Sequence, residues 1–123
     1  MRSTLRIVTI LLGTVFTLQG VGWLVAPERA AAGLGMPVLD GIARSTQFGD
    51  FAAFFLTLGV SILVAIALGR SRLLYFPAGL LGSAAFCRTI AWAAHGAAFA
   101  ATFIAVEIIA CLLLLSSAWQ AER

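Results

Sequence analysis

The sequence predicts an all-α fold: a membrane-embedded bundle of four transmembrane helices, formed by a single domain over residues 1–123. The chain is 62% hydrophobic and 11% charged, whereas soluble domains average about 45–50% apolar and about 25% charged residues. Four apolar runs each approach the roughly 20 residues that cross a bilayer as a helix. None shows the alternation of a membrane β-barrel, so helices are the structure that satisfies the backbone in lipid.

The four spans are expected at about residues 5–26, 51–68, 73–94 and 97–119, with an extracytoplasmic loop over residues 27–50. The first run has the charged start of a secretory signal peptide, but its apolar stretch exceeds the usual length of about 7–15 residues. We therefore expect a retained span, with cleavage near Ala30-Ala31-Ala32 as the alternative.

The 27–50 loop is the only connection long enough to hold structure of its own. Its alanine run, Ala30-Ala31-Ala32, predicts a short helix that Gly33 would break. From Asp40 the chain is expected to become helical again and to lead into the second span. Asp40 and Arg44 would then lie one turn apart as an ion pair.

The distribution of arginines predicts that both termini are cytoplasmic (N-in/C-in). Five arginines flank the termini and the second connection, and two lie in the 27–50 loop. Cytoplasmic segments carry the excess of Arg and Lys, so the His95-Gly96 turn is expected outside. The chain has no Lys and its arginines are scattered, which argues against a nucleic-acid partner. Three tryptophans near span ends suit interfacial belts: Trp23, Trp92 and Trp119.

Small residues, which let helix backbones approach closely, mark the expected contact faces between spans. These faces are Gly13, Thr17 and Gly20 in the first span, and Gly79 with Ser83 and Ala78 with Gly82 in the third. These residues predict packing between the spans and indicate no catalytic or binding function.

Two charged residues lie inside the spans, Arg88 in the third and Glu107 in the fourth. A charge near the bilayer centre costs at least about 2.5–3.5 kcal/mol on insertion scales, so such residues usually face the bundle and have a partner. Both lie at similar depths below the His95-Gly96 turn, and we expect them to pair. Gln19 and Asp50 are expected nearby, in the outer half of the first and second spans.

These residues form an expected polar cluster, which is either ligand-binding or structural. Its members are Arg88, Glu107, Gln19, Asp50 and His95, with Arg44 at the mouth and Trp92 on the Arg88 face. As a binding site, it would use Arg88 to hold an anionic head group or to balance Glu107. As a structural element, it would fix helix register through an ion pair, with Gln19 as an interhelical hydrogen bond. Intramembrane ionisable residues are functional candidates by default.

No catalytic residues, metal ligands or cofactors are predicted. The chain has one His and lacks the GxSxG, HExxH and phosphate-loop patterns. Cys87 and Cys111 lie inside apolar runs without metal or redox spacing. We therefore lean against an enzyme.

Four features follow one another along the chain. They are Pro27 at the end of the first span, Arg44 before a glycine-containing turn, Arg88 in the third span and Glu107 in the fourth. This order resembles a family of small bacterial four-span membrane proteins of unknown function, loosely DoxX-like. Phe48 departs from that pattern, which has paired glycines before the second span. The resemblance implies a multi-pass protein of the bacterial inner (cytoplasmic) membrane.

Three functions are compatible with the sequence. We favour an accessory or ligand-binding protein whose outward-facing polar pocket takes a lipid or quinone-like ligand from the bilayer. The alternatives are a proton-coupled small-molecule transporter that uses Glu107, and a membrane oxidoreductase component acting on a quinone, which Phe99 and Phe103 would suit. A homo-oligomer or a membrane-complex subunit is plausible, because four spans enclose little volume.

Overall fold

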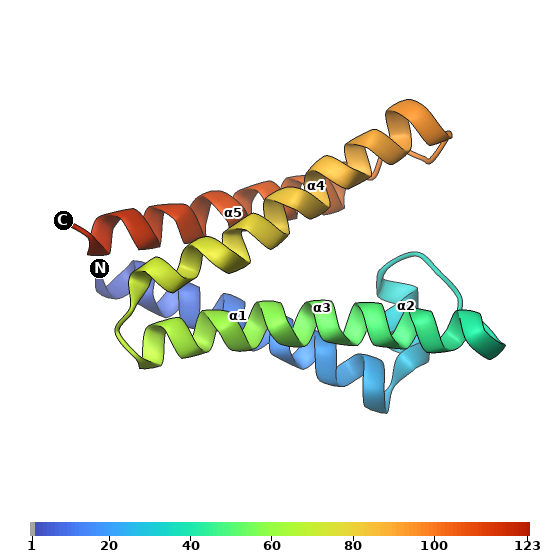
Figure 1. The fold of residues 1–123 in the computed structure, drawn as a ribbon, viewed down its shortest axis with the longest axis horizontal. Helices are drawn as coiled ribbons and strands as arrows, with labels where there is room; N and C mark the ends of the chain where they lie inside the picture. The colour runs from blue at the N-terminus through green and yellow to red at the C-terminus, as the bar shows by residue number, and fades with distance from the viewer. Residues whose placement is uncertain (1) are drawn as a thin grey trace.

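The computed structural model describes residues 2–123 and is all-helical (Figure 1). Its elements are α1 (Ser3–Val25), α2 (Pro27–Gly33), α3 (Gly41–Ala67), the 3-10 helix η1 (Ser71–Leu74), α4 (Tyr75–His95) and α5 (Ala101–Ala121). Four of these segments are long and apolar enough to cross a membrane: α1, α3, η1 with α4, and α5. The predicted fold class, a bundle of four long apolar helices, is confirmed.

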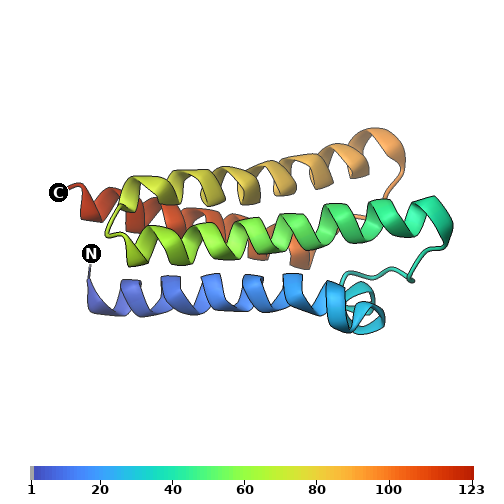
Figure 2. The ribbon, with the colours of Figure 1, turned by 60° about the horizontal axis from the view of Figure 1, so that its bottom comes forward.

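The long helices form two pairs, α1 with α3 and α4 with α5 (Figures 1 and 2). The pairs pack together at the end that carries both termini and η1, where Leu74, Leu81 and Leu114 are fully buried. At the same end a buried hydrogen bond of 2.9 Å joins the Thr9 and Ser117 hydroxyls, linking α1 to α5. Toward the opposite end the pairs diverge (Figure 1), and this divergence positions the site described below.

Close backbone approach joins α1 to α3 through glycine. A Cβ at Gly59 would collide with backbone atoms of Thr17 and Gly13, and one at Gly20 would meet Leu56 at 2.6 Å. The predicted contact face of the first span is therefore confirmed. In α4 only the Ala78 and Gly82 face packs inside the bundle, because Gly79 and Ser83 are exposed within the described chain.

Helix α3 begins at Gly41, which confirms the expected return to helix after Asp40. Its 27 residues measure about 40 Å, longer than the roughly 30 Å hydrocarbon core. Its polar first turns therefore extend beyond the apolar stretch that the sequence marks from Phe51. The α4–α5 connection is longer than expected, since α5 begins at Ala101 after Gly96 ends α4 with φ +68°, a conformation that suits glycine.

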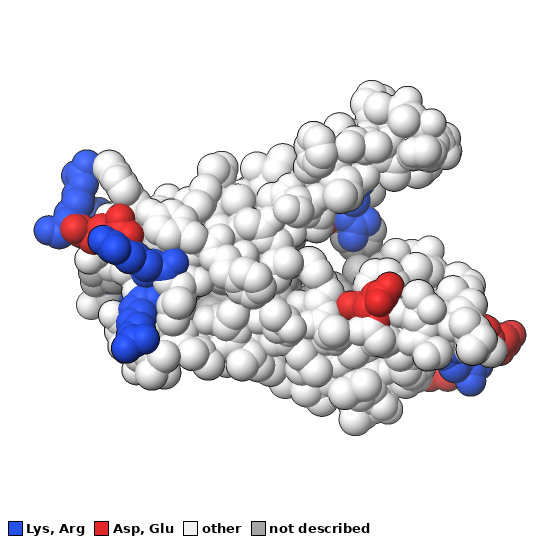
Figure 3. Space-filling model, in the orientation of Figure 1, with Lys and Arg blue, Asp and Glu red and all other residues white. Residues whose placement is uncertain are grey.

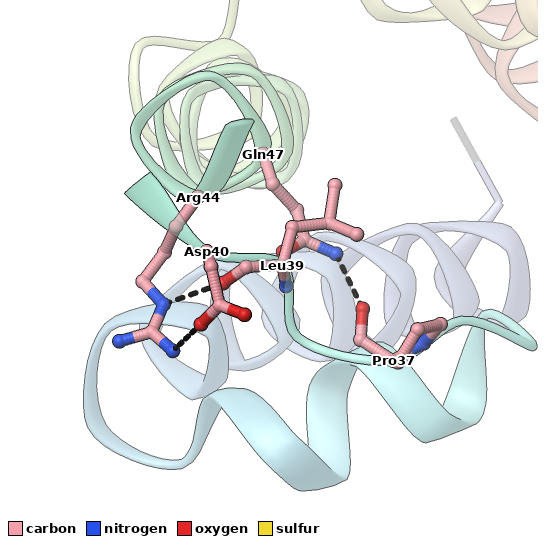
Figure 4. A network of polar contacts seen from close by, with 5 residues as sticks. All are labelled: Pro37, Leu39, Asp40, Arg44 and Gln47. Carbon is pink, nitrogen blue, oxygen red and sulfur yellow. Dashed lines mark hydrogen bonds and ion pairs between the residues drawn. The ribbon is translucent and has the colours of Figure 1, made fainter. Parts of the chain in front are cut away.

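The expected short helix in the first loop is present as α2, whose Ala31 is completely buried. The connection from α2 to α3 is then tied to α3 by Gln47, which is buried and was not assigned this role from the sequence (Figure 4). The Leu39 N–H donates to Gln47 Oε1 at 2.9 Å, and Gln47 Nε2 donates to the Pro37 carbonyl at 2.9 Å. The loop over residues 34–40 is thereby held against α3 at the end of the bundle opposite the termini.

The aromatic residues near span ends have different environments. Trp92 and Trp119 are about half exposed, as an interfacial position requires. Trp23 instead is 1% exposed, stacked on Phe51 at 5.1 Å between ring centroids and edge-on to Phe48 at 5.9 Å. The first turns of α3 therefore cover this ring, and Phe48 and Phe51 supply its aromatic contacts.

The two ends of the bundle differ in charge. At the end with the termini basic atoms predominate, with a few acidic atoms between them, whereas basic and acidic atoms are more evenly mixed at the other end (Figure 3). At the first end Arg72 Nε lies 3.3 Å from Glu122. At the second, Arg44 pairs with Asp40 at 3.0 Å, which confirms that predicted ion pair.

Candidate functional site

A cavity of about 570 Å³ lies between the diverging helix pairs, a volume within the range of about 300–1,000 Å³ that small-molecule sites occupy. Figure 3 shows the hollow, with basic atoms on its upper wall. Helices α1 to α5 all contribute to its lining. Most of the wall is apolar, and five aromatic rings line it: Phe16, Trp23, Phe54, Phe55 and Phe103.

The polar lining residues number five: Gln19, Arg29, Arg88, Thr102 and Glu107. An apolar cavity with a few polar groups is the usual form of a small-molecule site, because the walls supply burial and the polar groups fix orientation. The lining thus suits a ligand that is apolar over most of its length and polar at one or two points.

Arg88 and Glu107 form the predicted pair across α4 and α5, with Arg88 Nε donating to Glu107 Oε1 at 2.5 Å. Each residue lies roughly two helical turns from the connection that joins the two helices. The Arg88 guanidinium carbon also lies 4.7 Å from the centre of the Phe103 ring, a cation–π arrangement. Arg88 is therefore oriented by two residues of α5.

The helix faces that carry these charges follow from residue spacing. On α5, Glu107 shares its face with Ile104, Ala110 and Leu114, which are all buried at intervals of three or four residues. On α4, Ala85 is buried one turn before Arg88, and Ala84 lines the cavity. Small and apolar neighbours therefore bring both charged residues to the interior where α4 and α5 contact each other.

The two partners differ in burial. The Glu107 side chain is 11% exposed and that of Arg88 is 35% exposed. The second carboxylate oxygen of Glu107, Oε2, is buried and forms no hydrogen bond within residues 2–123. A buried carboxylate oxygen without a donor is unusual, because nearly all buried polar atoms in proteins are hydrogen-bonded. Glu107, which contributes to the cavity wall, thus retains one buried acceptor without a donor.

Three residues of the predicted cluster line the cavity, and four do not. Gln19, Arg88 and Glu107 contribute to the wall, although the Gln19 side chain makes none of the hydrogen bonds found among the described residues. The remaining four lie outside this lining: Asp50, His95, Arg44 and Trp92.

Each of these four has another environment. Asp50 is exposed on α3, and His95 is exposed at the end of α4. Arg44 donates to Asp40 and to the Leu39 carbonyl at the start of α3 (Figure 4). The Trp92 ring packs on Phe99 at 5.0 Å between centroids, outside the cavity lining.

Arg29 is the charged lining residue that the sequence did not place at the site. Its position in the 27–50 loop contributed only to the prediction of membrane topology. Pro27 begins α2 directly after α1, and burial of Ala31 fixes α2 against the bundle, so that Arg29 and Ala30 reach the cavity. The aromatic lining of the cavity could not be predicted either. Its rings come from α1, α3 and α5, and the sequence does not determine how these helices are rotated relative to one another.

No group of three or more His, Cys, Asp or Glu side chains that could hold a metal ion occurs within residues 2–123. No protein-family model, curated protein or solved structure matches the chain.

Proposed function

We propose that this multi-pass membrane protein is a small binding protein, which holds a lipid-like or quinone-like molecule in the cavity between its helix pairs. The observation that carries the proposal is the combination of an aromatic, mostly apolar cavity with a buried ion pair in its wall. A long apolar ligand would complete the packing that the divergent helices leave open. Its polar group would meet Arg88 and the free oxygen of Glu107.

A purely structural ion pair explains less of what is observed. Such a pair needs only a dry contact between α4 and α5, and its oxygens are normally all hydrogen-bonded when they are buried. Here Arg88 is one-third exposed beside the cavity, and Glu107 keeps one buried oxygen without a donor. A hydroxyl or amide donor on a ligand would satisfy that oxygen.

The proposal includes an orientation, with both termini and η1 in the cytoplasm of a bacterial cell and the cavity in the outer half of the inner membrane. It is supported by the arginines, five of which lie beside the termini and the α3–η1 connection, against two in the segment between α1 and the first turns of α3. Segments rich in positively charged residues tend to stay on the cytoplasmic side when the helices insert into the membrane.

The test is thermal stability of the purified protein in a neutral detergent, with and without a lipid extract of bacterial membranes or a quinone extract. A ligand that binds only the folded state raises the melting temperature. In Glu107→Gln, the amide oxygen still accepts from Arg88, so we expect the variant to fold. Its ligand-dependent rise should be lost, because the amide replaces the free carboxylate oxygen with a donor.

The control is Asp50→Asn, which removes the same charge from an exposed residue outside the cavity. Wild type and Asp50→Asn should both show the rise. Absence of a rise in every protein, with Glu107→Gln clearly destabilised, would leave the structural ion pair as the better explanation.

A further inference from the structure

The charges that line the cavity do not balance. Two arginines, Arg29 and Arg88, face one carboxylate, Glu107. Glu107 pairs with Arg88, whereas Arg29 takes part in none of the ion pairs formed within residues 2–123. The neighbouring acids Glu28 and Asp50 do not line the cavity. The site therefore has one excess positive charge, and Arg29 carries it.

Arg29 lies at one end of the cavity, on the short helix that follows α1. The 23 residues of α1 measure about 34 Å, slightly more than the roughly 30 Å hydrocarbon core. Helix α2 therefore lies at the membrane–water boundary, where lipid head groups are. Arg88 and Glu107 lie deeper, roughly two turns inside their helices. The cavity thus has an exposed cation at the head-group level and an aromatic interior below it.

We infer that the ligand is an anionic lipid, whose oxyanion head group binds Arg29 while one hydrocarbon chain enters the cavity along Phe54 and Phe55. The inference rests on the proposed function and specifies the ligand of the same site. A guanidinium presents its donors in a planar fork that matches phosphate and carboxylate oxygens, so charge complementarity favours an anion at this position. The polar group that reaches Glu107 must be a neutral donor, such as a hydroxyl, because the carboxylate oxygen repels a second anion.

A lipid fits this arrangement better than a soluble anion does. A soluble phosphate would use Arg29 and leave the apolar wall uncovered, whereas a chain covers that wall without requiring any donor or acceptor. The helix pairs diverge (Figure 1), and the hollow between them opens along the side of the bundle as well as at its end (Figure 3). The hydrocarbon chain of a lipid therefore has a route from the bilayer into the cavity.

The experiment compares affinities of defined lipids for the full-length protein in a neutral detergent, measured as the lipid-dependent shift of the melting temperature. The probes are phosphatidylglycerol, which is anionic, phosphatidylcholine, which is zwitterionic, diacylglycerol, which is neutral, and inorganic phosphate. We expect wild type to prefer phosphatidylglycerol over phosphatidylcholine. Arg29→Gln should reduce the affinity for phosphatidylglycerol about tenfold, the loss expected for one charge-assisted hydrogen-bonded contact. It should weaken phosphatidylcholine binding less, because the choline offsets the phosphate charge, and should leave diacylglycerol binding unchanged.

The matched control is Arg44→Gln, which removes the same charge at the same end of the bundle from a residue outside the cavity. It should keep the preference for the anionic lipid. An equal loss in both variants would mean that general surface charge sets the preference, and the inference would be wrong. Stabilisation by inorganic phosphate alone would equally contradict a lipid ligand.

The outcomes separate this inference from the proposed function. Equal binding of all three lipids by wild type would retain a lipid-binding protein and overturn the anionic ligand. Binding of none of them would overturn both. Because Arg29 is exposed, Arg29→Gln should melt at the wild-type temperature without lipid, which shows that any lost affinity is not a loss of fold.

Discussion

Replacing Arg88 by Ala should destabilise the bundle more than replacing its partner Glu107 by Ala. The reasoning starts from burial, because the Glu107 side chain is 11% exposed and that of Arg88 is 35% exposed. In Arg88→Ala, Oε1 of Glu107 loses its donor and Oε2 already has none, so both carboxylate oxygens are left without a hydrogen bond. Removing one partner of a buried pair typically costs about 3–5 kcal/mol, and we expect a loss in that range.

Glu107→Ala leaves a less isolated charge. Arg88 keeps its position over the Phe103 ring at 4.7 Å, a contact that contributes about 0.5–2 kcal/mol depending on desolvation. Its partly exposed guanidinium can also reach water in the cavity. The loss in free energy of unfolding should therefore be smaller than in Arg88→Ala, by about 1 kcal/mol.

The assay is reversible unfolding in mixed micelles, followed by circular dichroism, for wild type, both single variants and the double variant. Because the two side chains contact each other directly, the double variant should lose less than the two single losses added together, by about 0.5–3 kcal/mol. Arg70→Ala is the control, since Arg70 is exposed and outside the ion pairs of residues 2–123, and should change stability by no more than about 0.5 kcal/mol. Additive losses, or a larger loss in Glu107→Ala, would refute the reasoning.

Two further predictions concern topology and packing. A membrane-impermeant maleimide added outside intact cells should label a Cys introduced at Gly35 and spare one at Ser71; the reverse pattern would invert the proposed orientation, and labelling of both would contradict the four-span topology. Gly59→Ala should destabilise the bundle by about 1–3 kcal/mol, because its Cβ would collide with the backbone of Thr17 and Gly13. The control is Gly79→Ala, because a Cβ at Gly79 meets no atom within 4 Å. It should leave stability unchanged or raise it by about 0.5–1 kcal/mol. Equal losses of stability in Gly59→Ala and Gly79→Ala would disprove the close α1–α3 contact.

The number and type of helices could be predicted because in lipid they depend on local properties. Apolar runs of bilayer length set the four spans, and small residues on one face of α1 set its contact with α3. The return to helix after Asp40 could also be predicted, and α3 begins at Gly41. That α3 covers Trp23 could not be predicted, because this contact depends on how α1 and α3 are rotated about their axes.

The ion pair was predictable and the cavity was not, for a physical reason. A charged residue inside a span is costly unless it is paired, so one Arg and one Glu in adjacent spans are expected to form an ion pair. Whether Gln19 or Asp50 joins them depends on helix rotation and tilt, which sequence spacing leaves open. Arg29 was missed because its position depends on the direction in which α2 folds back after Pro27. The loosely DoxX-like resemblance stays a prediction.

The location of the ion pair links the packing of the bundle to its proposed role. Glycine contacts hold α1 and α3 together near Gly13, Gly20 and Gly59, whereas α4 and α5 are fixed to them mainly at the end with η1, by buried leucines and the Thr9–Ser117 hydrogen bond. Arg88 and Glu107 lie in the part where the helix pairs have separated. Lipid chains that filled this gap at random would face a partly exposed guanidinium and an unsatisfied carboxylate oxygen. A ligand with a matching polar group would satisfy both and cover the aromatic wall. Under the proposed function, the divergence of the helix pairs would therefore weaken their packing and at the same time make the cavity selective.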